Sequence, residues 1–220
     1  MTDEILTKNQ ISFLQKCQES DFLINNFYLT GGTALAAFYL KHRHSEDLDF
    51  FSESEFDILN IDVFIKKFQD ALNISKIDFQ QSYNRNIFFL TLGKEVLKTE
   101  FTFFPFTRIE RGQHEYGIEI DSLIDIAVNK LFTIYQRTQA RDYIDLYFIC
   151  REKSFAIKDL IAKAKIKFDW HIDSLQLGTQ FIKGGETKDY PRMIKNIRPE
   201  IWQTFFIKEA KKLKGEIIDN

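Results

Sequence analysis

FYLTGGTALAAFYLKHRHSEDLDFF, the segment formed by residues 27–51, decides the fold expected for this chain. Residues 27–29 predict a short strand that runs into Gly31-Gly32, and the Ala- and Leu-rich stretch 33–40 predicts a helix. A polar loop separates this helix from the alternating residues 47–51, which predict a second strand. The expected order is therefore strand, glycine turn, helix, loop and strand.

The remaining expected elements extend this order along the chain. They are a helix near 5–14, a helix at 61–73, strands at 76–81, 86–92 and 97–104, helices from Asp121 or Ser122 to about Arg137 and at 141–150, and a mostly helical stretch at 155–214 broken at Gly184-Gly185. Together they predict a mixed α/β (α+β) fold in which helices cover a mixed sheet. We expect residues 1–120 to form the core and residues 121–220 to form a helical region packed on it.

Composition indicates a globular, cytoplasmic protein. Hydrophobic residues make up 44% of the 220 residues, and the 23 Phe predict an aromatic-rich core. Residues 1–4 lack the basic start of a signal peptide, and no apolar run approaches the length of a membrane span, so no membrane partner is expected. Cys17 and Cys150 lie in apolar surroundings, which favours small buried side chains over a disulfide or a metal site.

Charge is divided unevenly along the chain. Residues 1–150 carry 15 Lys and Arg against 22 Asp and Glu, whereas residues 151–220 carry 15 against 10. This division is compatible with an acidic catalytic half and a basic half that meets phosphate-rich partners. Solvated helix faces are the other explanation of the basic half.

Asp47 and Asp49 are candidate metal ligands. Side chains two residues apart in a strand share a face, so both carboxylates project together while Leu48 and Phe50 face the core. Two close anions repel each other unless a cation lies between them, and their oxygens suit an Mg²⁺ ion completed by phosphate oxygens. The pair alone is also typical of a solvated strand end, so the interpretation depends on its surroundings.

Gly31-Gly32 supplies those surroundings. Because the two glycines follow a strand and open a helix, the backbone N–H groups of residues 32–34 can point at a triphosphate with no side chain in the way. Thr33 can add a hydroxyl donor. The 14 residues between Gly32 and Asp47 leave room for one short helix and a loop that returns Asp47 beside the turn. The spacing therefore favours neighbouring metal and phosphate sites for an Mg²⁺-nucleoside triphosphate.

Glu100 is the candidate third carboxylate. An acceptor hydroxyl that attacks an α-phosphate must lose its proton, and a nearby carboxylate can accept it. In the strand at 97–104, Glu100 and Thr102 share one face, while Phe101 and Phe103 line the other. The alternative is an exposed glutamate on an edge strand.

A later cluster combines cations with carboxylates. Lys130 and Arg137 lie seven residues apart on one expected helix, and Asp142 and Asp145 lie three apart on the next. Lys130 is the candidate for gripping the β- and γ-phosphates and stabilising departing pyrophosphate. Arg141 and Asp145 are expected to form an ion pair that orients the site.

The polar loop at 41–46 holds a further candidate. Arg43 is suited to contact phosphate. Its neighbours His42 and His44 raise the alternative of a His/Asp zinc centre, which the lack of Cys partners or a second His pair disfavours.

Together these residues resemble a known family, the bacterial abortive-infection nucleotidyltransferases of the AbiEii/AbiGii toxin type. The similarity covers roughly residues 20–150. Its motifs are Leu29-Thr-Gly-Gly-Thr-Ala-Leu35, Arg43-His-Ser-Glu-Asp-Leu-Asp-Phe-Phe51, Asn129-Lys130, and Arg137-x3-Arg141-Asp142-Tyr-Ile-Asp145-Leu.

The resemblance implies roles by position. Gly31, Gly32 and Thr33 match the phosphate-holding turn, Asp47 and Asp49 match the metal pair, and Lys130 and Asp145 match the later essential cluster. The ancestral turn of the family is usually Gly-Ser, whereas this chain has Gly-Gly followed by Thr33.

The resemblance also implies a polymerase-β-like nucleotidyltransferase fold, Mg²⁺-dependent use of an NTP, and often a toxin role opposed by a cognate antitoxin. Some members attach nucleotides to the 3′ end of tRNA. We therefore predict an enzyme that transfers a nucleoside monophosphate from an NTP to an acceptor hydroxyl, with the tRNA 3′ end favoured, in a type IV-like toxin–antitoxin or abortive-infection system. Two alternatives stay open: a small-molecule acceptor, as in antibiotic nucleotidyltransferases, and a catalytically silent binding module of the same fold.

Overall fold

The chain forms two compact units. The computed structural model describes residues 5–218, so residues 1–4, on which the argument against a signal peptide depends, lie outside the described part. None of the helices within 5–218 is long and apolar enough to cross a membrane. The first unit comprises Met1–Tyr39 and Ser45–Ser122, and the second comprises Leu40–His44 and Leu123–Asn220.

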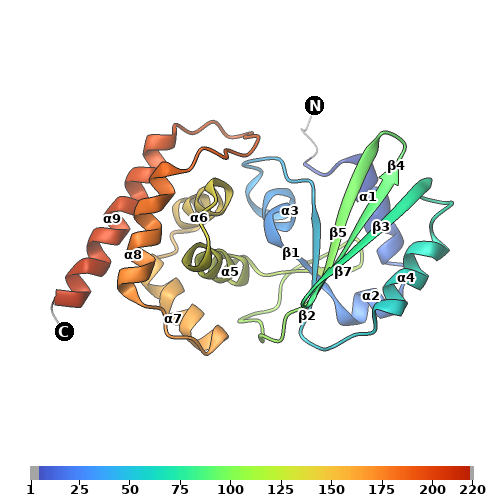
Figure 1. Ribbon diagram of the computed structural model, residues 1–220, viewed down its shortest axis with the longest axis horizontal. Helices are drawn as coiled ribbons and strands as arrows, with labels where there is room; N and C mark the ends of the chain where they lie inside the picture. The colour runs from blue at the N-terminus through green and yellow to red at the C-terminus, as the bar shows by residue number, and fades with distance from the viewer. Residues whose placement is uncertain (1–4, 219–220) are drawn as a thin grey trace. The chain divides into compact units, whose positions relative to one another are not determined.

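A seven-stranded mixed sheet forms the first unit together with its helices (Figure 1). In chain order the elements are α1 (Lys8–Cys17), α2 (Asp21–Asn26), β1 (Tyr28–Thr30), α3 (Gly31–Ala34), a π-helical segment η1 (Leu35–Leu40), β2 (Leu48–Ser52), α4 (Ile58–Lys67), β3 (Ile74–Ser82), β4 (Arg85–Leu92), β5 (Glu95–Phe103), β6 (His114–Glu115) and β7 (Ile118–Ile120). Across the sheet the order is β3-β4-β5-β2-β1-β7-β6. Strand β2 runs parallel to β5 and antiparallel to β1, and β1 runs parallel to β7. The predicted mixed α/β fold is confirmed.

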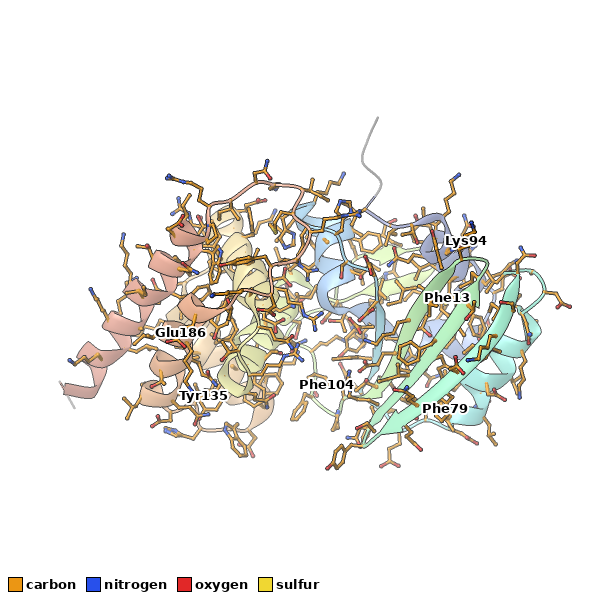
Figure 2. The ribbon with its side chains drawn as sticks, turned by 45° about the horizontal axis from the view of Figure 1, so that its top comes forward. Phe13, Phe79, Lys94, Phe104, Tyr135 and Glu186 are labelled. Carbon is orange, nitrogen blue, oxygen red and sulfur yellow. The ribbon has the colours of Figure 1, made fainter. Side chains whose placement is uncertain are left out.

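Aromatic side chains fill the space between this sheet and helices α1 and α4. The ring centroid of Phe13 in α1 lies 6.2 Å from that of Phe50 in β2 and 5.7 Å from that of Phe64 in α4. Phe50 stacks on Phe101 of β5 with centroids 4.9 Å apart, and Figure 2 shows Phe13 within this layer. All four rings are buried, and each contributes roughly 1.5–3 kcal/mol by leaving water. This face of β2 and β5 is thereby closed, which leaves the opposite face to their polar residues.

Helix α4 lies a few residues earlier than the predicted helix at 61–73. It begins at Ile58 because the side chain of Asp57 caps it by accepting a hydrogen bond of 2.9 Å from the backbone N–H of Leu59. It ends at Lys67, and Asn73 in the left-handed region (φ 55°) then directs the chain into β3.

Two further differences concern short elements. The helix predicted at 33–40 is present as α3 followed by the π-helical segment η1. Strands β6 and β7 were not predicted because two and three residues are too few to show a period-two pattern.

The second unit contains helices and no strand of the sheet among its described residues. Its elements are α5 (Leu123–Gln136), α6 (Ala140–Lys153), α7 (Ile157–Phe168), α8 (Ser174–Lys183), a 3₁₀ turn η2 (Gly184–Glu186) and α9 (Pro199–Ile218). Figure 1 shows α8 and α9 side by side, joined by a long connection. The predicted helices and the predicted break at Gly184-Gly185 are confirmed.

Tyr143 of α6 explains why that break falls at a glycine. Its ring packs 5.1 Å from Phe206 and 6.0 Å from Trp202 of α9, and its hydroxyl donates to the carbonyl of Gln180 at 2.7 Å. A Cβ atom at Gly184 would approach the ring to 2.7 Å, so only glycine lets the chain lie flat against it. Burial raises the pKa of Tyr143 to about 12, so the hydroxyl stays protonated as a donor.

Both cysteines are buried and free, as predicted. Burial raises the pKa of Cys17 well above its ordinary value and that of Cys150 to about 12. Each thiol therefore stays protonated and behaves as a small apolar side chain.

Candidate active site

Gly31 stands at the junction between β1 and α3. Its φ of +74° lies in the left-handed region, which glycine adopts without the steric cost that a Cβ atom imposes. The chain reverses from strand to helix at this residue, and the first backbone N–H groups of a helix have no partner within the helix. The turn therefore places the first amide donors of a helix at a residue without a Cβ atom, where another group can approach the backbone closely.

Asp49 lies directly against this turn. In β2, Leu48 and Phe50 are fully buried, as the alternation predicted, so Asp49 projects from the opposite face. A Cβ atom built on Gly31 would overlap the Oδ2 atom of Asp49. The glycine turn and the Asp49 carboxylate thus meet within the first unit.

The parallel register of β2 and β5 places further charged residues beside this pair. Asp49 lies opposite Glu100, and the Nζ atom of Lys98 contacts Oδ2 of Asp47 at 2.6 Å. Because β5 lies between β4 and β2, the alternative of an edge-strand glutamate does not apply to Glu100, which is buried. One face of the sheet therefore carries three carboxylates in a row.

Arg85 of β4 neutralises the third carboxylate. Its Nε and Nη2 atoms donate to Oε1 and Oε2 of Glu100, each at 2.6 Å, and the hydroxyl of Thr102 donates to Oε1 at 2.9 Å. Burial acts to raise the pKa of Glu100, but the hydrogen bonds and charge of Arg85 outweigh it and hold the pKa below its ordinary value. The same contact raises the pKa of Arg85. Glu100 is therefore an ionised carboxylate in a bidentate ion pair.

Thr33 joins the glycine turn to β2. Its hydroxyl donates to the backbone carbonyl of Asp47, and the side chain is buried. In this arrangement the hydroxyl hydrogen of Thr33 holds the segment that contains Asp47 beside the turn. The sequence-based role for that hydrogen, donation to a phosphate, stays a prediction.

The donor set on this face fits Mg²⁺ bound together with a triphosphate. Within residues 5–218, no three His, Cys, Asp or Glu side chains converge as a ready-made metal cage. Mg²⁺ in nucleotide sites commonly takes one or two protein carboxylates and completes its shell with phosphate and water oxygens. Asp47 already holds the cationic Lys98, and the missing Cβ of Gly31 lets the Asp49 carboxylate approach the backbone of the turn. Asp47 and Asp49 would hold the ion.

A second charged cluster lies in the second unit and centres on Asp145. This carboxylate is fully buried and accepts hydrogen bonds from Arg43 Nε (2.6 Å), Arg43 Nη2 (2.8 Å) and His42 Nε2 (2.8 Å). Nζ of Lys130 lies 2.7 Å from Asp145 Oδ2. Burial acts to raise the pKa of Asp145, but Arg43 and Lys130 hold it well below its ordinary value. The predicted Arg141–Asp145 pair is not formed, since Arg141 donates to Gln139 instead.

Lys130 links this centre to Asp142. Its Nζ atom also donates to Asp142 Oδ1 at 2.7 Å, and Arg137 lies 3.2 Å from Asp142 Oδ2. Burial acts to raise the pKa of Asp142, but the charge of Lys130 and then that of Arg137 hold it below its ordinary value. Lys130 is therefore fixed between two ionised carboxylates.

The structure thus sorts the predicted site residues into two groups. Gly31, Gly32, Thr33, Asp47, Asp49 and Glu100 belong to the first unit, and Arg43, Lys130 and Asp145 belong to the second. Arg85 and Lys98 join the first group although the sequence did not single them out. Lys98 carried a readable signal, because it lies two residues before Glu100 and so shares its face of the strand. Arg85 carried none, since its place beside Glu100 depends on the pairing of β4 with β5.

Comparison with known proteins gives results consistent with this geometry. The family model "Nucleotidyl transferase AbiEii toxin, Type IV TA system" matches residues 13–213. The protein aq_aa25 of Aquifex aeolicus (strain VF5) is 32% identical over 165 residues, which cover 74% of this chain and 76% of that protein.

Solved structures share the fold. The crystal structure of JHP933 from Helicobacter pylori matches 96% of this chain and 94% of its own, with a TM-score of 0.58 and 20% identity. MenT4, the nucleotidyltransferase toxin Rv2826c from Mycobacterium tuberculosis H37Rv, matches 93% of this chain and 82% of its own, with a TM-score of 0.53 and 14% identity. At these identities the likeness extends to the fold alone.

Proposed function

This chain belongs to the AbiEii nucleotidyltransferase toxin family, and from that premise we propose that it transfers a nucleoside monophosphate from an Mg²⁺-bound NTP to a hydroxyl of an RNA acceptor. The 3′ end of tRNA is the favoured acceptor. A cognate antitoxin is the proposed protein partner. The chain is a nucleotidyltransferase by family; the acceptor, the metal and the partner are the proposal.

One observation carries the proposal: Gly31 and Asp49 touch. An anion-binding turn and a carboxylate pair that lie in contact can hold a triphosphate and its counter-ion at once, because phosphate oxygens complete the shell of the metal. Neither feature alone distinguishes a transferase from a structural turn or a solvated strand end. Their contact on one face of the sheet supports nucleotide binding at this place.

The proposed reaction forms one phosphorus–oxygen bond and breaks another. The acceptor hydroxyl oxygen bonds to the α-phosphorus, the bond from that phosphorus to the β-phosphate bridging oxygen breaks, and pyrophosphate leaves with the bonding electron pair. Bound Mg²⁺ supplies charge stabilisation for the phosphate oxygens. The amides at the Gly31 turn hold the triphosphate, and Asp47 and Asp49 hold the ion.

The proton of the acceptor hydroxyl needs a base, for which we propose Glu100. Both of its oxygens accept hydrogen bonds from Arg85, so proton acceptance requires that Arg85 release one of them. A triphosphate that draws the guanidinium toward itself frees that oxygen, since Arg binds phosphate in the same bidentate way. Lys98 would likewise have to leave the Asp47 carboxylate for Asp47 to hold the ion.

The cluster around Asp145 enters the proposal as a positioning group. Asp145 holds the guanidinium of Arg43 and the ammonium of Lys130 in fixed directions. Cations held in this way keep a fixed side-chain conformation, so that binding an anion costs little further side-chain entropy. Phosphate binding by Arg43 and Lys130 stays a prediction.

The experiment that tests the function follows both ends of the triphosphate. Purified protein is incubated with total tRNA and Mg²⁺ and, in parallel, with NTPs labelled at the α- or the γ-phosphate. We expect α-label to become attached to RNA and γ-label to leave as pyrophosphate, with neither occurring after chelation of the metal. Release of γ-label as inorganic phosphate, or attachment of γ-label to the acceptor, would mean hydrolysis or phosphoryl transfer and would contradict the proposal.

Substitution of Gly31 by Ala tests the contact that carries the proposal. The new Cβ atom forces Asp49 away from the turn, and displacement of a catalytic group by about 1 Å costs on the order of 100-fold in rate. We expect a drop in α-label transfer of about that size. The left-handed backbone adds a stability loss of about 1–2 kcal/mol.

Gly93 provides the matched control. It lies in the β4–β5 turn of the same unit with a φ of +64°, but a Cβ atom there would meet nothing within 4 Å. Gly93→Ala should therefore lose similar stability in urea unfolding and keep its transfer rate. If both variants transfer label at the same rate, the contact between Gly31 and Asp49 has no part in the reaction.

A further inference from the structure

A surface hollow of about 510 Å³ lies within the second unit. Helix α6, the connection that precedes α9 and the first turn of α9 form its walls. Its lining residues are Tyr147, Phe148, Arg151, Glu152, Asn196, Ile197, Arg198 and Ile201. The volume falls in the range of small-molecule and nucleotide sites, roughly 300–1,000 Å³.

Aromatic and aliphatic side chains form the apolar part of the hollow. Tyr147 is half-buried, and its ring is held edge-on against Phe205 at 5.4 Å and against Phe148 at 5.6 Å. Ile201, which is 41% exposed, lines the same hollow. A rigid aromatic ring beside an exposed aliphatic side chain offers a flat surface on which a planar base can stack.

Cations dominate the polar part of the hollow. Arg151 and Arg198 are both exposed. The acid of the lining, Glu152, is already paired with Nζ of Lys195 at 2.6 Å. The net charge around the hollow is therefore positive, which favours binding of a phosphate. Glu152 is not expected to bind a ligand, because it is paired with Lys195.

His42 connects this hollow to the Asp145 cluster. The His42 ring lies 5.2 Å from the ring of Phe148, while its Nε2 atom contacts Asp145 at 2.8 Å. The carbonyl of His42 accepts backbone hydrogen bonds from Ile194 (2.9 Å) and Lys195 (3.0 Å). The connection that forms one wall of the hollow is thereby fixed to the backbone of His42, whose ring contacts the Asp145 carboxylate that holds Arg43 and Lys130.

We propose that this hollow binds one nucleotide of a single-stranded RNA, its base on Tyr147 and Ile201 and its neighbouring phosphates on Arg151 and Arg198. The inference rests on the proposed function, because it assigns that RNA as the acceptor. Proteins that bind single-stranded nucleic acids commonly combine an aromatic stacking surface with nearby cationic side chains. A peptide groove would instead present a continuous apolar lining with pockets for side chains.

The test measures binding of a fluorescein-labelled single-stranded RNA of about 12 nucleotides by anisotropy at several salt concentrations. Arg198→Glu should weaken binding at least about tenfold and lower the slope of log K against log salt by about 1. Tyr147→Leu keeps an apolar side chain but removes the ring, and should weaken binding about tenfold with little change in slope.

Matched controls separate the hollow from the general charge of the unit. Lys208→Glu makes a similar charge change at an exposed position of α9 outside the hollow, and Trp170→Ala removes a 57% exposed ring elsewhere in the unit. Both should bind RNA within about twofold of the parent. Thermal unfolding of each variant shows that it is folded.

The proposal is overturned by equal weakening in the controls or by parental binding of Arg198→Glu and Tyr147→Leu. Absence of RNA binding by the parent at low salt also overturns it and leaves a protein segment as the occupant to examine. The label-transfer experiment keeps the two ideas separate. If the parent transfers α-label to RNA while the hollow variants bind RNA normally, the proposed function stands and the proposed RNA site is wrong.

Discussion

Asp49→Asn should lower the rate of nucleotidyl transfer by at least about 1,000-fold, which corresponds to roughly 4 kcal/mol of lost transition-state stabilisation. The substitution keeps the size of the side chain but removes one of the two carboxylate charges proposed to hold Mg²⁺. A neutral amide is a much poorer ligand for this ion, so both the metal and the triphosphate lose their position. The measurement is the single-turnover rate of α-label transfer to RNA.

Folding should not suffer from this change. Asp49 lies partly exposed on the polar face of β2, and asparagine has the same size and shape, so the packing of the sheet is unchanged. We expect the free energy of unfolding in urea to stay within about 0.5 kcal/mol of the parent. Glu46→Gln is the control, because it makes the same charge change at an exposed residue of the preceding loop. Transfer by Asp49→Asn at the parental rate would refute the proposed metal site.

Asp145→Ala should have the largest effect on stability, a loss of about 3–5 kcal/mol. The substitution leaves the buried side chains of Arg43 and His42 without their acceptor, and Lys130 loses one of its two carboxylates. Removal of one partner from a buried ion pair costs far more than the pair contributes, because the remaining charges stay desolvated. Urea unfolding of the parent and the variant measures the difference.

Asp142→Ala is the matched comparison on the same helix. Asp142 is also buried, but its partner Arg137 has a side chain that is 49% exposed and can turn to solvent, and Lys130 keeps Asp145. A smaller loss is therefore expected. Equal losses in the two variants would show that Asp145 has no special place in the cluster.

The dependence of the free energy of unfolding on pH gives a second test of the role of Asp145. Its pKa in the folded protein lies well below the ordinary 3.8, so the unfolded state binds the proton first as the pH falls. The stabilisation from Asp145 is thus fully present above pH 3.8 and is lost progressively below it. Asp145→Asn should remove this part of the acid sensitivity and flatten the dependence of stability on pH in that range.

Several features of the site followed from local sequence. The alternation at 47–51 predicted that Leu48 and Phe50 would be buried and that Asp49 would face away from them, as the structure has it. The strand–glycine–helix order predicted the turn at Gly31. Both predictions succeeded because the period-two pattern of a strand and the conformational freedom of glycine are properties of a few consecutive residues.

Other features depended on pairing between distant segments. Glu100 was open to the edge-strand alternative until the order β4-β5-β2 placed it inside the sheet. Arg85 became its partner through the register of β4 with β5. Residues 41–44, which the sequence pattern assigned to a polar loop, belong to the helical unit, where His42 and Arg43 contact Asp145 about one hundred residues later in the chain.

The sequence by itself determined the longer elements, their order, the family and the faces on which the aspartates and aromatic rings lie, because these follow from short-range periodicity and from motifs of adjacent residues. Only the tertiary structure decided which charges neutralise one another: Lys98 with Asp47, Arg85 with Glu100, and Arg43 with Asp145. Ion pairs of this kind depend on strand register and on helix packing. Both are set by the burial of large apolar surfaces far from the charges themselves.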